Sequence, residues 1–152
     1  MPEKLTLEHP ALSVASLERS IAFYRDVIGL ELVRVIEVPE QHRLGEVVNI
    51  PGCAARIAHL RGGSALLELL EYVTPGGRPI AADRTQADHG FSHIGFTSND
   101  IHGDYGRLTR EGVVFYNTPI EYRPRIWVAY FYGPDGETCE LRQSLEQPRD
   151  VV

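Results

Sequence analysis

Two histidines and two glutamates recur at matching places in the two halves of this 152-residue chain. The sequence HPALS, which begins at His9, is similar to HIGFT, which begins at His93; LEL around Glu68 is similar to CEL around Glu140. Imidazole and carboxylate groups bind borderline-hard divalent metals such as Ni, Co, Zn, Fe and Mn. If the halves pack about a pseudo-two-fold axis, all four side chains point into one cleft. The pattern therefore predicts a single divalent-metal site.

The setting of Glu68 supports this interpretation. It lies among five apolar residues in the segment ALLELL, where an unpaired buried carboxylate would be costly. A bound metal would remove that cost. A single histidine or glutamate on a strand is more often an ordinary half-exposed polar group, so the prediction of a metal site depends on the repeat. His59 has no matching histidine in the second half, which argues against its being a ligand.

The elements that must position these residues repeat as well. In the first half we expect a helix after Ser16 that ends at Gly29, and strands over residues 5–14, 31–38, 54–60 and 65–72. In the second half we expect a helix from Asp100 to about Arg110, and strands over residues 92–97, 113–117, 126–132 and 137–142. Each half then has the order strand, helix and three strands, which indicates a duplicated module.

Composition narrows the classes of function. An apolar fraction of 43% and a charged fraction of 24% fit a single soluble globular domain over residues 1–152. The net charge of −6 argues against a nucleic acid or an anionic membrane as a partner, because both require a basic surface. We find no signal peptide and no apolar span, and Cys53 and Cys139 do not indicate an oxidising compartment. We therefore expect a cytoplasmic protein.

These motifs together resemble the vicinal oxygen chelate superfamily, which includes glyoxalases, methylmalonyl-CoA epimerases, extradiol dioxygenases, and fosfomycin and bleomycin resistance proteins. The resemblance covers about residues 5–143 and rests on LSV after His9, SLERSIAFYRDVIGL over 16–30, SHIGF over 92–96 and PDGETCEL over 134–141. Ser16 and Gly133 stand where the family usually has aspartate, and neither is a metal ligand.

The resemblance implies an α+β fold. Paired βαβββ modules over residues 5–72 and 91–143, joined by a linker over 73–90, would form a curved sheet around a metal-binding cleft. It also implies a homodimer, with the site built within one chain or across the dimer interface.

For function, the resemblance places His9, Glu68, His93 and Glu140 on the metal-ligand pattern of glyoxalase I, with one divalent ion as cofactor. It implies a lyase, isomerase or epimerase that stabilises an enolate of a small 2-oxo, hemithioacetal or thioester substrate. A ligand glutamate takes the proton in glyoxalase I. We therefore expect Glu140 to be the general base, with Glu68 as its partner on the opposite face.

Two other functions stay open. Two histidines and one carboxylate suit an Fe(II) extradiol-type dioxygenase, although Glu68 as a further ligand favours the lyase or epimerase. A metal-free small-molecule binding or resistance protein would use the same cleft, and the aromatic strand over 126–132 is suited to it. Arg125, Trp127 and Tyr130 are the candidate substrate-binding residues, as a cationic anchor and two aromatic walls. No motif identifies the substrate.

Overall fold

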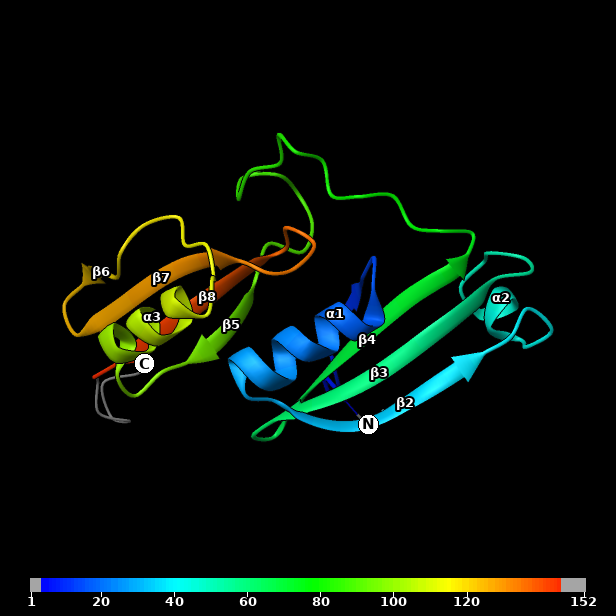
Figure 1. Ribbon diagram of the computed structural model, residues 1–152, viewed down its shortest axis with the longest axis horizontal. Coiled ribbons are helices and arrows are strands. Elements are labelled where there is room, and N and C mark those ends of the chain that lie inside the picture. The colour runs from blue at the N-terminus through cyan, green and yellow to red at the C-terminus, as the bar shows by residue number, and fades with distance from the viewer. Residues whose placement is uncertain (1–3, 146–152) are drawn as a thin grey trace. The chain divides into compact units, whose positions relative to one another are not determined.

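The computed structural model describes residues 4–145, which form two compact units that divide after Pro79 (Figure 1). We call residues 4–79 the first module and residues 80–145 the second module, and we describe each by itself. The division falls inside the segment 73–90 that the sequence indicated as a linker.

The first module is a four-stranded mixed sheet with a helical segment. Its elements are β1 (Ala11–Ser13), α1 (Leu17–Ala22), the π-helical η1 (Phe23–Ile28), β2 (Glu31–Val38), α2 (Leu44–Val47), β3 (Ala54–Gly62) and β4 (Ala65–Thr74). The strand order is β1-β4-β3-β2, with β1 parallel to β4 and the other pairs antiparallel.

Local sequence explains where the helical segment begins and ends. The Ser16 side chain accepts a hydrogen bond from the Arg19 amide, which caps the first turn as predicted. Gly29 ends the segment in a left-handed conformation with φ of 98°, which a residue without Cβ adopts at little cost. Leu17 and Tyr24 are completely buried, so this segment supplies much of the apolar core of the module.

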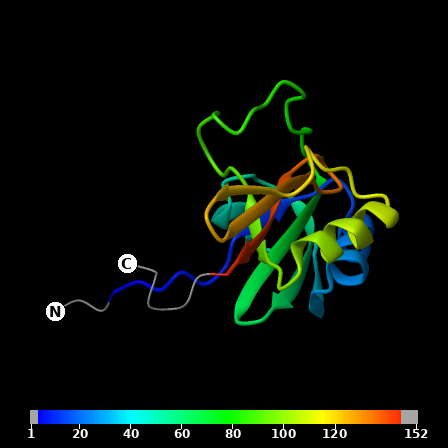
Figure 2. The same ribbon diagram turned by 90° about the vertical axis from the view of Figure 1, so that its left-hand side faces the viewer.

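The second module repeats this plan. Its elements are β5 (Ile94–Thr97), α3 (Ile101–Arg110), β6 (Ile120–Arg123), β7 (Ile126–Tyr132) and β8 (Thr138–Ser144). The strand order is β5-β8-β7-β6, again with the first strand parallel to its neighbour. Asp100 caps α3 by accepting from the Gly103 amide, as predicted, and Figure 2 shows α3 running along one face of its sheet. Phe131 is fully buried and packs against Phe96 and Phe115.

The predicted α+β fold with two βαβββ modules is confirmed, and the sheets do not close into a barrel. Three expectations about elements were wrong. The first strand covers only residues 11–13, beyond Pro10, which lacks an amide hydrogen for a ladder. No helix or strand was expected over residues 39–51, which contain the short helix α2.

The third error concerns residues 113–117, which form only one isolated bridge, from Phe115 to Phe131. The edge strand is instead β6, which begins immediately after Pro119. A proline interrupts strand pairing because it cannot donate a hydrogen bond. Among residues 4–145, no helix is long and apolar enough to cross a membrane.

Candidate functional site

Strand register brings a histidine to a glutamate in each module. On the parallel pair β1 and β4, Ala11 lies opposite Glu68; on β5 and β8, Gly95 lies opposite Glu140. His9 and His93 each stand two residues before the residue opposite the glutamate. Two residues along an extended chain return to the same face of a sheet. The same register therefore produces the same His–Glu pair twice, once within each module.

In the first pair, His9 Nε2 lies 3.7 Å from Glu68 Oε1. The other ring nitrogen, Nδ1, lies 3.2 Å from Glu8 Oε2. Because a carboxylate only accepts hydrogen bonds, Nδ1 carries the hydrogen and donates it to Glu8. Nε2 is then the nitrogen that faces Glu68, and in the neutral imidazole it is unprotonated. In that form the pair offers one nitrogen and one oxygen to a cation.

The second pair has nearly the same geometry. His93 Nε2 lies 3.5 Å from Glu140 Oε2, and His93 Nδ1 lies 3.0 Å from the hydroxyl of Ser92. Both histidine side chains are 31% exposed, and the side chains of Glu68 and Glu140 are 18% and 15% exposed. In both pairs, therefore, the histidine is partly accessible to solvent and the carboxylate is more sheltered.

The neighbours of the two glutamates differ. His59 on β3 lies opposite Glu68, and its Nε2 is 2.7 Å from Glu68 Oε2. Tyr130 on β7 lies opposite Glu140 and packs edge-on against the ring of His93, with centroids 5.3 Å apart. Burial, together with the charge and a hydrogen bond of Glu140, raises the pKa of the Tyr130 hydroxyl. Tyr130 is therefore the counterpart of His59.

The donor atoms fit a divalent metal. Nitrogen and oxygen ligands about 2.1 Å from one ion lie roughly 3.0 to 3.4 Å apart. The separations of 3.7 and 3.5 Å in the two pairs need little change to reach that spacing. Within residues 4–145, no group of three or more His, Cys, Asp and Glu side chains is arranged to hold a metal. Each pair by itself therefore offers two ligands.

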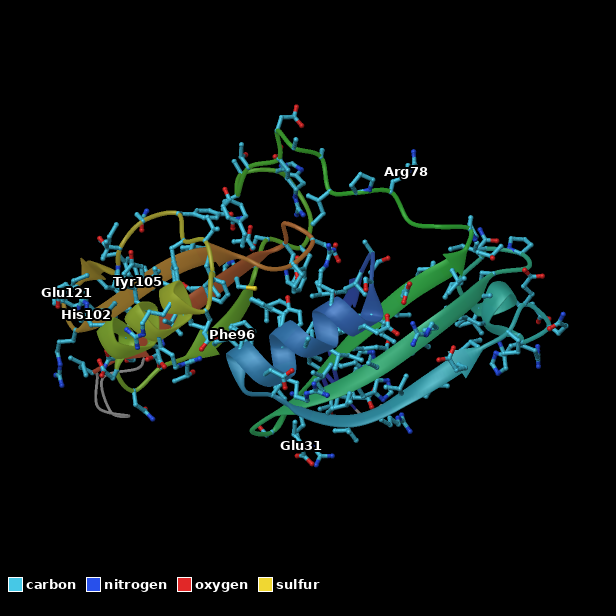
Figure 3. The ribbon with its side chains drawn as sticks, in the orientation of Figure 1. Glu31, Arg78, Phe96, His102, Tyr105 and Glu121 are labelled. Atoms are coloured by element: carbon cyan, nitrogen blue, oxygen red, sulfur yellow. The ribbon has the colours of Figure 1, made fainter. Side chains whose placement is uncertain are left out.

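The predicted substrate-binding residues lie in different places. Tyr130 is beside Glu140, as described above. Trp127 alternates to the other face of β7, where its ring packs against His102 of α3 with centroids 4.9 Å apart. Figure 3 labels His102 and, on the same helix, Tyr105. Arg125 lies in the turn before β7, where its guanidinium donates to the Leu145 carbonyl. The structure thus brings Tyr130 to the His93–Glu140 pair, but not Trp127 or Arg125.

A pocket of about 240 Å³ lies in the second module. Tyr116, Tyr132 and Thr138 line it together with residues of the segment 80–86. Tyr132 and Thr138 are each two residues from Tyr130 and Glu140, so strand alternation places them on the face that carries the His–Glu pair. The Thr138 hydroxyl is 2.8 Å from Tyr116 Oη and 2.7 Å from Gln86 Nε2.

Sequence reasoning missed Tyr116 and Gln86, because each reaches the pocket from an irregular segment. Tyr132 had a usable signal, since it lies two residues after Tyr130 on an aromatic strand.

Comparisons with known proteins agree with this fold. A model of the glyoxalase/bleomycin resistance protein/dioxygenase superfamily matches residues 6–141. A glyoxalase family protein of Bacillus cereus is 25% identical, with 95% of this chain and 97% of that chain covered and a TM-score of 0.84. The trypanothione-dependent glyoxalase I of Leishmania major is 20% identical, with coverages of 92% and 87% and a TM-score of 0.68.

A glyoxalase I mutant of Zea mays is 21% identical, with coverages of 92% and 45% and a TM-score of 0.69. At such identities the last two structures indicate the fold alone. No curated protein has a sequence that matches this chain significantly. From the family match over residues 6–141 and the two βαβββ modules, the chain belongs to the glyoxalase/bleomycin resistance protein/dioxygenase superfamily.

Proposed function

We propose that the protein is a divalent-metal-dependent enzyme of glyoxalase type, a lyase, isomerase or epimerase acting on a small 2-oxo, hemithioacetal or thioester substrate. The observation that carries the proposal is the repeated pair in which a histidine nitrogen faces a carboxylate oxygen, at 3.7 and 3.5 Å. Two such pairs, His9 with Glu68 and His93 with Glu140, supply two nitrogen and two oxygen ligands for one ion of Ni, Co, Zn, Mn or Fe.

The two pairs come from different modules, so the proposal requires the modules to share one ion. They belong either to one chain or to the two chains of a homodimer. Cys53 and Cys139 are both buried and form no disulfide, which fits a reducing compartment, and we place the enzyme in the cytoplasm.

When bound, a divalent ion polarises the substrate carbonyl and stabilises the negative charge that develops on its oxygen. In our proposal Glu140 takes the proton from the carbon next to that carbonyl and returns it to the neighbouring carbon or to the other face. The raised pKa of Tyr130 keeps its hydroxyl protonated near neutral pH, so it donates to Glu140 and orients the base. The pocket beside Tyr132 and Thr138 accommodates the rest of a small substrate.

Two other functions, an Fe(II) dioxygenase and a metal-free binding protein, are distinguished by the test described below. An Fe(II) dioxygenase would need only two histidines and one carboxylate, whereas Glu68 points toward His9 in the same manner as Glu140 points toward His93. A metal-free binding protein would have no ion for the two repeated His–Glu pairs to hold. The geometry of the pairs therefore favours the four-ligand enzyme.

The test is the metal content of untagged protein, measured by elemental analysis before and after reconstitution with each candidate metal. We expect about one ion per chain, absent in His9→Ala and Glu68→Ala and retained in His89→Ala, which alters an exposed histidine of the segment 73–90. Loaded protein should turn over hemithioacetals of 2-oxoaldehydes, 2-oxo compounds or thioesters. Iron that survives Glu68→Ala would indicate the dioxygenase, and no metal under any reconstitution would indicate the binding protein.

A further inference from the structure

Three adjacent strands place Arg34, His59 and Glu68 side by side. Arg34 on β2 lies opposite His59 on β3, which lies opposite Glu68 on β4. Arg34 Nε is 2.7 Å from His59 Nδ1, and His59 Nε2 is 2.7 Å from Glu68 Oε2. His59 is only 8% exposed. The three side chains therefore form a continuous chain of hydrogen bonds that begins at the exposed Arg34, is sheltered at His59 and ends on a proposed metal ligand.

The direction of this chain follows from the chemistry of its first member. A guanidinium only donates hydrogen bonds, so His59 Nδ1 must accept the one from Arg34. The ring hydrogen is then on Nε2, and Nε2 donates it to Glu68 Oε2. Every bond is thus directed toward the carboxylate, and sheltering from water strengthens such bonds.

The two oxygens of Glu68 have separate tasks as a result. Oε2 accepts the hydrogen bond from His59, whereas Oε1 is the oxygen that faces His9 Nε2. We infer that Arg34 and His59 are positioning residues, which hold Glu68 with Oε1 presented to the metal. The inference rests on the proposed function, because it concerns a ligand of the proposed ion.

In the second module, the residue that lies opposite Glu140 is not a histidine held by an arginine. Tyr130 occupies the position of His59, so a phenol approaches Glu140 where an imidazole held by a guanidinium approaches Glu68. Outer partners of metal ligands typically contribute 10- to 100-fold to metal affinity. Glu68 therefore serves as the anchored ligand, which leaves Glu140 as the carboxylate that moves a proton.

The first test uses metal-free, uniformly ¹⁵N-labelled protein. Long-range ¹H–¹⁵N spectra distinguish a protonated from an unprotonated ring nitrogen, and the signals of His59 are those missing from His59→Gln. We expect a protonated Nε2 and an unprotonated Nδ1, and we expect Arg34→Met to remove this preference. A hydrogen on Nδ1 in the unmodified protein would overturn the inference without any reference to activity.

The second test is the affinity for Co²⁺, measured by chelator competition and by visible absorption. We expect a 10- to 100-fold loss in His59→Leu and in Arg34→Met, whose altered residue lies on the exposed edge strand and should not impair folding. His59→Gln, which keeps a donor amide, should recover most of the affinity. A purely structural role would not predict this recovery. The control His89→Leu should match the unmodified protein.

The outcomes separate the two hypotheses. If the unmodified protein binds Co²⁺ and both His59→Leu and Arg34→Met bind it equally well, the positioning role is refuted and the proposed function stands. If the unmodified protein binds no Co²⁺ or other divalent metal, the proposed function fails, and the positioning role fails with it.

Discussion

In the first module Glu68 accepts a hydrogen bond from an imidazole that is itself held by Arg34, whereas in the second module Glu140 lies beside the phenol of Tyr130. The His–Glu separations differ by only 0.2 Å, from 3.7 to 3.5 Å. Duplication thus preserved the pair that would bind a metal. The next neighbours differ, and the different roles that we propose for the two carboxylates rest on this difference.

The modules also differ in how the helix is attached to the sheet. In the first module Arg56 on β3 forms ion pairs with Glu18 of α1, Glu37 of β2 and Glu71 of β4. In the second module, aromatic rings join α3 to the sheet, such as His102 with Trp127. The first module thus adds ion pairs, which depend on pH, to the packing of Leu17 and Tyr24, whereas the ring contact in the second module is one of packing.

The largest expected effect comes from exchanging each glutamate for its amide. Glu140→Gln should retain the metal and lose turnover by about 10²- to 10⁴-fold, because the base is removed. Glu68→Gln should instead weaken metal binding before it affects the chemistry. Elemental analysis combined with kcat of the loaded protein distinguishes the two losses. Equal losses of kcat with metal retained in both variants would show that the carboxylates share the role of base.

The next effect concerns the two histidines. If the pairs share one ion, His9→Ala and His93→Ala should each abolish metal binding by the whole chain. The loss of metal affinity should exceed the roughly 100-fold loss expected when a residue that only contacts a ligand is replaced. Isothermal titration with Co²⁺ or Zn²⁺ gives the stoichiometry. A variant that keeps half of the sites would show that each module binds its own ion, and the shared four-ligand site would then be abandoned.

Arg56 provides a smaller, pH-dependent contrast. A hydrogen bond from Arg56 lowers the pKa of Glu18 below its ordinary value of 4.5. The resulting stability is therefore present above pH 4.5 and is lost as the pH falls through the lowered pKa. Arg56→Met should lower Tm near pH 7, and the difference from the unmodified protein should shrink progressively below pH 4.5.

Arg43→Met is the control, because it removes an exposed ion pair with Glu46 that should contribute little. A Tm difference for Arg56→Met that stays constant from pH 7 to pH 3 would show that Arg56 acts through packing alone.

The smallest effect is expected at Gly95, which stands where the first module has Ala11. A methyl group there would lie 3.5 Å from Glu140 Oε2, an ordinary contact. Gly95→Ala should stabilise the protein by about 0.4 to 1 kcal/mol, because it restricts the unfolded chain. Chemical denaturation measures this gain. A loss of stability would mean that the second pair needs space that the first pair does not.

Much of this molecule was predictable because its main signals are local. The cap at Ser16, the helix end at Gly29 and the alternation of strands depend on neighbouring residues. The repeat identified His9 and His93, and Glu68 and Glu140, as equivalent residues, because equal modules have equal registers. The orientation of Trp127 and the extent of the edge strand β6 were not predicted, since both depend on packing across the sheet.

From residue order one can derive the four candidate histidines and glutamates and the two βαβββ modules, because short-range patterns and their repetition encode both. The partner of each glutamate required the folded chain. The hairpin turns 63–64 and 133–137 differ in length, so counting residues does not align His59 with Tyr130. Only the pairing of β3 with β4 and of β7 with β8 reveals that these two residues correspond. Hydrogen bonds across a sheet follow register, and register is a property of the assembled strands.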